Sequence, residues 1–188
     1  IKGGRTIHDY WPKFKSIAVN VSIDGVYDTY EYIRGNGKFS VIEENIEVFK
    51  SFPNVSRVVG AFTVQANNIM QIDKVIDHFI NKMGIIFYSH RVNYPMSLSA
   101  QVLPPELKTK VIARLEQMKT EVLEYPMVKQ HKLLETVTLQ QIQDNINFLQ
   151  AKCMHETHWQ DCIEFNKRLD ETRGQDFLAS NPEFAPYV

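Results

Sequence analysis

The chain has 188 residues, of which 44% are hydrophobic and 23% charged, so it has enough apolar material for the core of one domain, with or without a small appendage. Its 21 basic and 22 acidic side chains nearly cancel, and no basic stripe favours a nucleic-acid partner. The apolar runs fall far short of the roughly 20 residues that span a bilayer, so we expect no membrane partner.

The chain contains two cysteines, Cys153 and Cys162. Two are too few for a disulfide framework, which favours a reducing, cytoplasmic setting. They are also too few to hold an iron–sulfur cluster, which usually takes about four thiolates. Together with His155 and His158 they do not form a standard zinc spacing, so we expect no metal ligands on this chain.

The first half of the chain alternates between strand and helix patterns. Alternating apolar residues predict strands over about 17–24, 57–65 and 85–93. Between them, apolar residues at helical spacing predict helices over about 38–52 and 67–83. This alternation is typical of parallel β-α units, either in an open doubly wound sheet or in part of a barrel.

The second half of the chain reads as helical. Three prolines predict a loop over 94–105, and a helix follows over 106–125. Thr138 is the expected N-cap of a long helical stretch that breaks near 152–155 and ends at Gly174.

The end of the first strand carries candidate ligand-binding residues. Ser22 and Asp24 share one face of the strand, because side chains alternate with period two, and we expect Arg34 to follow a turn. Parallel β-α folds bind ligands at the carboxyl ends of their strands. A hydroxyl, a carboxylate and a guanidinium there could hold ribose, amine and carboxylate groups. The alternative is an aspartate that caps the next turn beside a solvent-exposed arginine.

The next two strand ends repeat this pattern. Thr63, Gln65 and Asn67 could read a base edge or a peptide group, although Asn67 or Asn68 could instead cap the next helix. On the third strand, Ser89, Arg91 and Asn93 lie on one face and look like the floor of a site. The opposite register, which would turn Tyr88, His90 and Val92 inward, stays open.

Several short motifs in chain order resemble one known family. They are Ser22-Ile23-Asp24-Gly25, Glu31-Tyr32-Ile33-Arg34, Phe62 to Ile69, Tyr94-Pro95, Leu98-Ser99, Leu103-Pro104-Pro105 with Lys108, and the tail segment Leu169-Asp170, Arg173-Gly174, Phe177 and Pro182-Glu183. These residues resemble radical S-adenosylmethionine enzymes of the type with a twitch extension, over most of residues 10–188.

The resemblance implies an α/β fold with two parts. Residues 1–105 would be the C-terminal half of a partial β/α barrel, and residues 106–188 a helical, twitch-like extension. It also implies S-adenosylmethionine as cofactor, a [4Fe–4S] cluster, and hydrogen abstraction from the substrate by a 5′-deoxyadenosyl radical.

The resemblance also assigns roles to the strand-end residues. Ser22 and Arg34 would meet the methionine carboxylate or its surroundings, and Asp24 would lie near the ribose. Gln65 and Asn67 would line the cofactor or substrate side. The substrate, a peptide or a small molecule, stays unknown.

The cluster motif of the family, C-x3-C-x2-C, is absent from this chain. We expect it upstream of Ile1, which would make this chain the C-terminal part of a longer enzyme, inactive by itself. The alternatives are a non-catalytic binding or scaffold protein with a degenerate half-barrel, and an unrelated β/α enzyme. In a half-barrel the edge of the first strand would be open, which predicts self-association unless residues 1–16 cover it.

Overall fold

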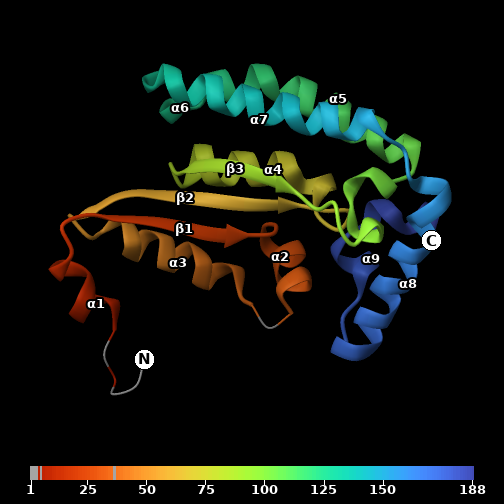
Figure 1. Cartoon of the computed structure of the whole chain (residues 1–188), viewed down its shortest axis with the longest axis horizontal. Helices are drawn as coiled ribbons and strands as arrows, with labels where there is room; N and C mark the ends of the chain where they lie inside the picture. The colour runs from red at the N-terminus through yellow and green to blue at the C-terminus, as the bar shows by residue number, and fades with distance from the viewer. Residues whose placement is uncertain (1–3, 5, 36) are drawn as a thin grey trace.

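The computed structural model describes residue 4, residues 6–35 and residues 37–188. Its centre is an open sheet of three parallel strands, β1 (Ile17–Ile23), β2 (Val55–Val64) and β3 (Ile86–Arg91), in the order β1-β2-β3 (Figure 1). The predicted strands are confirmed to within a few residues, and so is their parallel arrangement.

Most of the remaining chain is helical. The α-helices are α1 (Ile7–Tyr10), α2 (Tyr27–Arg34), α3 (Phe39–Lys50), α4 (Ile72–Ile76), α5 (Pro105–Glu121), α6 (Pro126–Gln130), α7 (Lys132–Ala151), α8 (His155–Arg173) and α9 (Phe177–Ser180). The short 3₁₀ turns are η1 (Trp11–Lys13), η2 (Ile69–Gln71), η4 (Met96–Leu98), η5 (Ala100–Val102), η6 (Val122–Glu124) and η7 (Pro182–Tyr187), and η3 (Asp77–Lys82) is a π-helix that continues α4.

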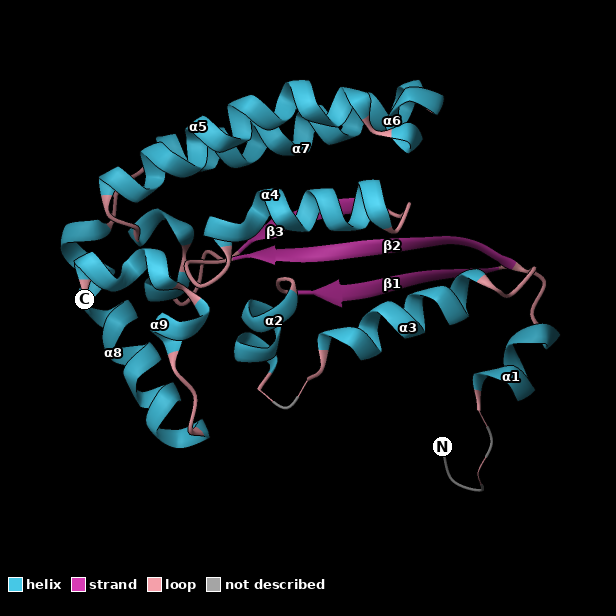
Figure 2. Ribbon diagram, turned by 180° about the vertical axis from the view of Figure 1, so that it is seen from behind, coloured by secondary structure: helices cyan, strands magenta, loops and turns pink. Residues whose placement is uncertain are grey.

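The connecting helices α3 and α4 cover one face of the sheet. They lie behind the strands in Figure 1 and in front of them in Figure 2. Ile23 and Phe62 on that face are fully buried, in one cluster with Ile46 of α3 and Val75 of α4. The same cluster continues to Phe184, so one core runs across the predicted boundary at residues 105 and 106.

The structure overturns the predicted partial β/α barrel. The outer edge of β3 faces α7, where a barrel would place another strand. The backbone N–H of Ser89 donates to Oε1 of Gln141 on α7 at 2.8 Å, and Asn145 donates to the Ser89 hydroxyl at 2.9 Å. Among the described residues, no strand follows β3. A helix therefore ends the sheet, and its Gln141 accepts from a backbone N–H that would otherwise face a further strand.

The outer edge of β1 has no strand beside it in the described part of the chain. The segment before β1 packs at the amino end of the sheet, where the Trp11 ring lies 5.2 Å from the rings of Phe49 and Phe52. Asn54 holds this segment in place by donating to the carbonyls of Trp11 and Phe14. Self-association through the β1 edge stays a prediction.

Two local predictions from the sequence are wrong. The segment after Gly25 is the helix α2, where we expected only a turn. Thr138 lies inside α7 and is buried, since that helix begins at Lys132. The expected break at 152–155 and the helix end at Gly174 are confirmed, and Gly174 adopts the left-handed conformation with φ of 63°. Within the part of the chain that the structure describes, no helix is both long enough and apolar enough to cross a membrane.

Gly25 is required at the turn from β1 into α2. Its φ is +155°, and a Cβ there would lie 3.0 Å from the backbone N of Tyr30. We expect Gly25→Ala to lower the free energy of unfolding by about 1–3 kcal/mol, from backbone strain and crowding together. Urea unfolding measures the change. Gly84→Ala is the control, since Gly84 has a φ of +61° but open space around it, and an equal loss in both variants would remove crowding as a cause.

Candidate functional site

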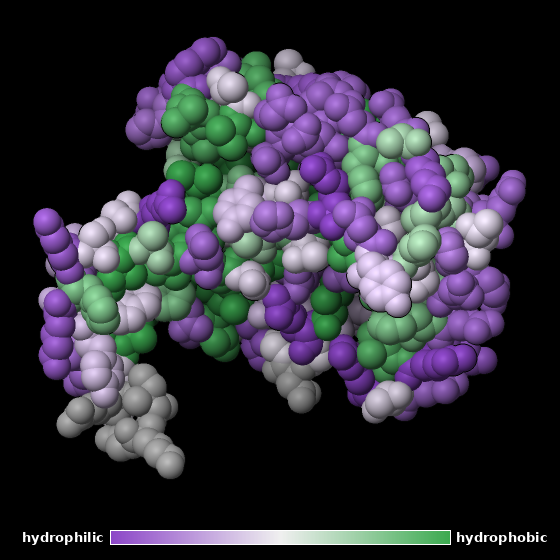
Figure 3. All heavy atoms as spheres, in the orientation of Figure 1, coloured by the Kyte–Doolittle hydropathy of each residue, from purple (hydrophilic) through white to green (hydrophobic). Residues whose placement is uncertain are grey.

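The sheet face opposite α3 and α4 is polar toward its carboxyl end. The pairing register places Ser22 beside Ala61 and Tyr88, and Thr63 beside His90. Ser22 and His90 are exposed and Thr63 is half-buried. This face is turned toward the viewer in Figure 1, and Figure 3 shows hydrophilic and intermediate spheres over the middle of the molecule, next to a hydrophobic strip.

The sequence left two registers open for the third strand. The structure has the one in which Tyr88 and His90 lie on this face. Tyr88 lies in register with Ala61 and therefore with Ser22, and His90 lies in register with Thr63. Both side chains are therefore on the same face of the sheet as Ser22. Ser89 points the other way and is bound by Gln141 and Asn145. The first register, in which Ser89, Arg91 and Asn93 would form the floor of a site, is therefore not the one that the structure adopts.

Asp24 and Arg34 form an ion pair at the carboxyl end of β1. The Arg34 Nε lies 2.6 Å from Oδ2 of Asp24, whose side chain is 11% exposed, whereas that of Arg34 is 40% exposed. Helix α2 makes this contact possible, because it folds the chain back and places its last residue beside the strand end. The pair brings two predicted site residues together and leaves part of the guanidinium open to a ligand.

Asn68 ties the ends of β1 and β2 together. Its Nδ2 donates to the carbonyls of Asp24 and Thr63 at 3.0 and 2.8 Å, and its Oδ1 accepts from the N–H of Gln65 at 2.9 Å. Asn68 is fully buried, and the side chain of Gln65 is half-buried. The predicted role of Asn68 was only that of a helix cap, whereas its side chain holds the two strand ends in place.

Asn67 faces α8. Its side-chain amide exchanges two hydrogen bonds with Asn166, of 2.7 and 3.1 Å, and the hydroxyl of Tyr32 donates to the same Asn166 oxygen at 3.1 Å. All three side chains are at least 97% buried. Burial and the nearby Asp170 carboxylate raise the pKa of Tyr32. Asn67 therefore binds the helical part of the chain, which the sequence analysis did not foresee.

Helix α8 also caps the end of α2. Arg173 Nη1 donates to the carbonyls of Tyr32 and Ile33, each at 3.3 Å, and Gln175 donates to the carbonyl of Glu31 at 3.2 Å. A cation beside helix C-terminal carbonyls is favourable because it opposes the helix dipole. Two of the motifs that carry the resemblance, about 140 residues apart, therefore meet beside Arg34.

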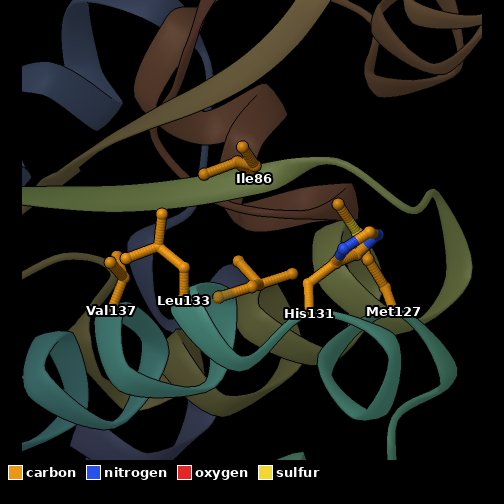
Figure 4. Close-up of a pocket in the computed structure, with 6 residues that line it drawn as sticks. Ile86, Met127, His131, Leu133 and Val137 are labelled. Atoms are coloured by element: carbon orange, nitrogen blue, oxygen red, sulfur yellow. The ribbon is translucent and has the colours of Figure 1, made fainter.

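Two concavities are relevant to ligand binding. The first, of about 440 Å³, is polar and is lined by Arg34, Gly35, Thr172, Arg173 and Gln175. The second, of about 350 Å³, lies at the start of α7 and is apolar except for the imidazole of His131 (Figure 4). The polar concavity adjoins the Asp24–Arg34 pair and so belongs to the candidate site, while the apolar one offers a single polar side chain to a ligand.

The described residues do not fit an iron–sulfur cluster. They include no group of three or more histidine, cysteine or acidic side chains placed to hold a metal ion. Cys162 is fully buried in α8, and burial raises its pKa to about 12, whereas Cys153 is exposed. One thiol is exposed and the other buried, and in the described part of the chain neither belongs to a group of side chains that could bind a metal together.

The two thiols are expected to react very differently. In the folded protein Ellman's reagent should label Cys153 within minutes, while Cys162 should react only after denaturation, because a buried thiol with a raised pKa forms little thiolate. Labelling of Cys153→Ser and Cys162→Ser separates the two signals. Rapid labelling of Cys162 at pH 8 without denaturant would show that α8 does not pack as described.

Comparisons with protein-family models, with curated proteins and with solved structures found no match to this chain. The functional argument therefore rests on the residues and their geometry.

Proposed function

We propose that this chain is the C-terminal part of a radical S-adenosylmethionine enzyme and supplies contacts to that cofactor and to the substrate. The observation that carries the proposal is the grouping of Ser22, Asp24, Arg34 and Gln65 at the carboxyl ends of two adjacent parallel strands. That edge is where parallel α/β folds bind ligands.

The donor set suits the polar parts of S-adenosylmethionine. The exposed part of the Arg34 guanidinium can pair with the methionine carboxylate, and the exposed hydroxyl of Ser22 lies on the open face of the same strand. Asp24, held by Arg34, has a second carboxylate oxygen for a ribose hydroxyl or an amine. Gln65 directly follows the end of the neighbouring strand β2, and its side-chain amide can donate or accept.

Asn67 has a supporting role in this proposal. Its amide is occupied by Asn166, so it positions the loop after β2 while Gln65 contacts the ligand. In enzymes of this class the bound S-adenosylmethionine supplies the radical that removes a hydrogen atom from the substrate. In this proposal the residues of this chain bind and orient the cofactor and the substrate. The ligands of the cluster would come from another segment, and we expect this chain by itself to be inactive.

The gene that encodes this chain tests the proposal. We expect its reading frame to place C-x3-C-x2-C upstream of Ile1, and the full-length protein, purified anaerobically, to contain iron and sulfide and to form 5′-deoxyadenosine. A native gene without that motif would contradict the catalytic proposal and would favour a non-catalytic binding protein. A brown, iron-containing preparation of this chain alone would contradict the assignment of the ligands to another segment.

A further inference from the structure

A third concavity, lined by both apolar and charged side chains, lies on the helical side of the sheet, away from the candidate site. It holds about 870 Å³ between α3 and the π-helix η3, and its lining consists of Tyr27, Glu43, Glu44, Glu47, Val48, His78, Lys82 and Met83. Figure 2 shows α3 and α4, which η3 continues, on this side of the sheet, with the strands visible between them. These residues come from three elements, α2, α3 and η3 with its C-cap residue, so no local motif predicted the cluster.

The centre of this cluster is a row of three side chains. The Tyr27 hydroxyl lies 3.3 Å from Nδ1 of His78, and Nε2 of the same imidazole lies 3.0 Å from Oε1 of Glu43. His78 is 4% exposed, and its Nε2 is buried without a hydrogen bond of good geometry among the described residues. A buried polar atom in this state is costly, and such atoms recur where a ligand completes the bonding.

The charges around the row favour a cationic ligand. Lys50 neutralises Glu47 at 2.9 Å, and Lys82 lies 3.5 Å from Asp77. Burial lowers the pKa of His78, so the imidazole is neutral near pH 7. Lys82 lines the same concavity, but among the described residues neither Glu43 nor Glu44 lies within ion-pair distance of a lysine or an arginine. Two carboxylates are therefore left without a cation.

An aromatic face stands beside these carboxylates. The Tyr27 ring is 50% exposed and is held edge-on against Phe39 and His78, with ring centroids 5.1 and 5.7 Å apart. An exposed aromatic face next to carboxylates is the arrangement that proteins use for ammonium groups, which gain from both the charge and the π-system.

We propose that this concavity is a second binding site, for the primary ammonium group of a polyamine or of a lysine side chain. Glu43 and Glu44 would accept hydrogen bonds from the ammonium, Nε2 of His78 beside Glu43 would accept a third, and the Tyr27 ring would cover the alkyl chain of the ligand. The π-helix supports this role, because an inserted residue of this kind turns side chains out of the ordinary helical register and is frequent at functional sites.

Calorimetric titration of the full chain with spermidine tests the proposal, with parallel titrations of Nα-acetyl-lysine methylamide and its uncharged norleucine analogue. Binding of spermidine alone assigns a free polyamine, and binding of both amines assigns an ammonium group from either source. Glu44→Gln and Tyr27→Ala should each weaken the affinity about tenfold, as expected for the loss of one charge-assisted contact.

The control is Glu164→Gln on α8, an exposed glutamate far from the concavity, which should leave the affinity unchanged. The imidazole proton signals of His78 give a second readout, since ammonium binding at Glu43 should shift them. Failure of both amines to bind at millimolar concentration, equal binding of the norleucine analogue, or unchanged affinity in Glu44→Gln would overturn the proposal. None of these outcomes depends on S-adenosylmethionine.

Discussion

Replacement of Asn166 with leucine is expected to lower the free energy of unfolding by about 2–5 kcal/mol, because it leaves two buried polar groups without partners. Asn166 accepts from Tyr32 and exchanges two hydrogen bonds with Asn67, and both partners are at least 97% buried. Leucine has the same branched skeleton, with the same number of side-chain heavy atoms, and leaves no cavity, so the loss comes chiefly from the unpaired hydroxyl and amide.

Chemical denaturation of Asn166→Leu measures this loss, and a double-mutant cycle with Tyr32→Phe assigns it. Removal of the Tyr32 hydroxyl should recover part of the stability in the leucine background, since the hydroxyl then no longer needs a partner. Asn147→Leu is the control: Asn147 is an exposed residue of α7 that accepts one bond from Gln143. Similar losses in Asn147→Leu and Asn166→Leu would contradict the network.

Replacement of Arg34 with methionine is expected to cost about 2–3 kcal/mol, because it leaves the Asp24 carboxylate nearly buried without its cation. Methionine keeps most of the apolar stem of the side chain, so packing changes little. Thermal and urea unfolding should both show the loss.

The double variant with Asp24→Asn and Arg34→Met tests whether the unpaired carboxylate causes this loss. The neutral amide removes the buried charge, and we expect the double variant to be more stable than Arg34→Met alone. Lys38→Met, at an exposed lysine that pairs with Glu31 nearby, is the control and should change the stability by less than about 0.5 kcal/mol. If Asp24→Asn failed to rescue Arg34→Met, the ion pair would not account for the loss.

The local elements could largely be predicted from the sequence, because each depends on neighbours in the chain. The period-two pattern before Asp24 marks β1, and the helical spacing after it marks α3. The segment between them was harder: Tyr27 to Arg34 has few apolar residues at helical spacing, and its helix α2 depends on capping by Arg173 and Gln175 from the far end of the chain. The residues near α2 in the sequence give no sign of this capping.

The architecture could not be predicted in the same way. Parallel β-α units have the same local pattern in a barrel and in an open sheet, so the choice depends on what meets the outer edge of β3. Gln141 and Asn145 of α7 decide it by bonding Ser89, and helical periodicity gives no sign that two amides on one helix face will meet a strand edge. The same contact sets the register in which His90, and not Ser89, shares the polar face.

Part of the candidate site was predicted, and part needed the structure. Ser22, Asp24, Arg34 and Gln65 gather at one edge because strand ends do so in any parallel sheet. The turn of Asn67 toward Asn166 and the row from Tyr27 through His78 to Glu43 depend on packing between distant elements. Sequence spacing does not encode such contacts.

The most direct test of the central claim is the affinity of the full-length protein for S-adenosylmethionine, measured by calorimetry in three variants. Ser22→Ala and Gln65→Ala remove side chains at the carboxyl end of the sheet, and Ser56→Ala makes the same kind of change at its amino end, where Ser56 bonds the carbonyl of Ile17. We expect each of the first two to weaken binding about fivefold to tenfold, the effect of one lost hydrogen bond, and Ser56→Ala to leave it unchanged. Unchanged affinity in Ser22→Ala and Gln65→Ala would contradict the placement of the cofactor at this edge.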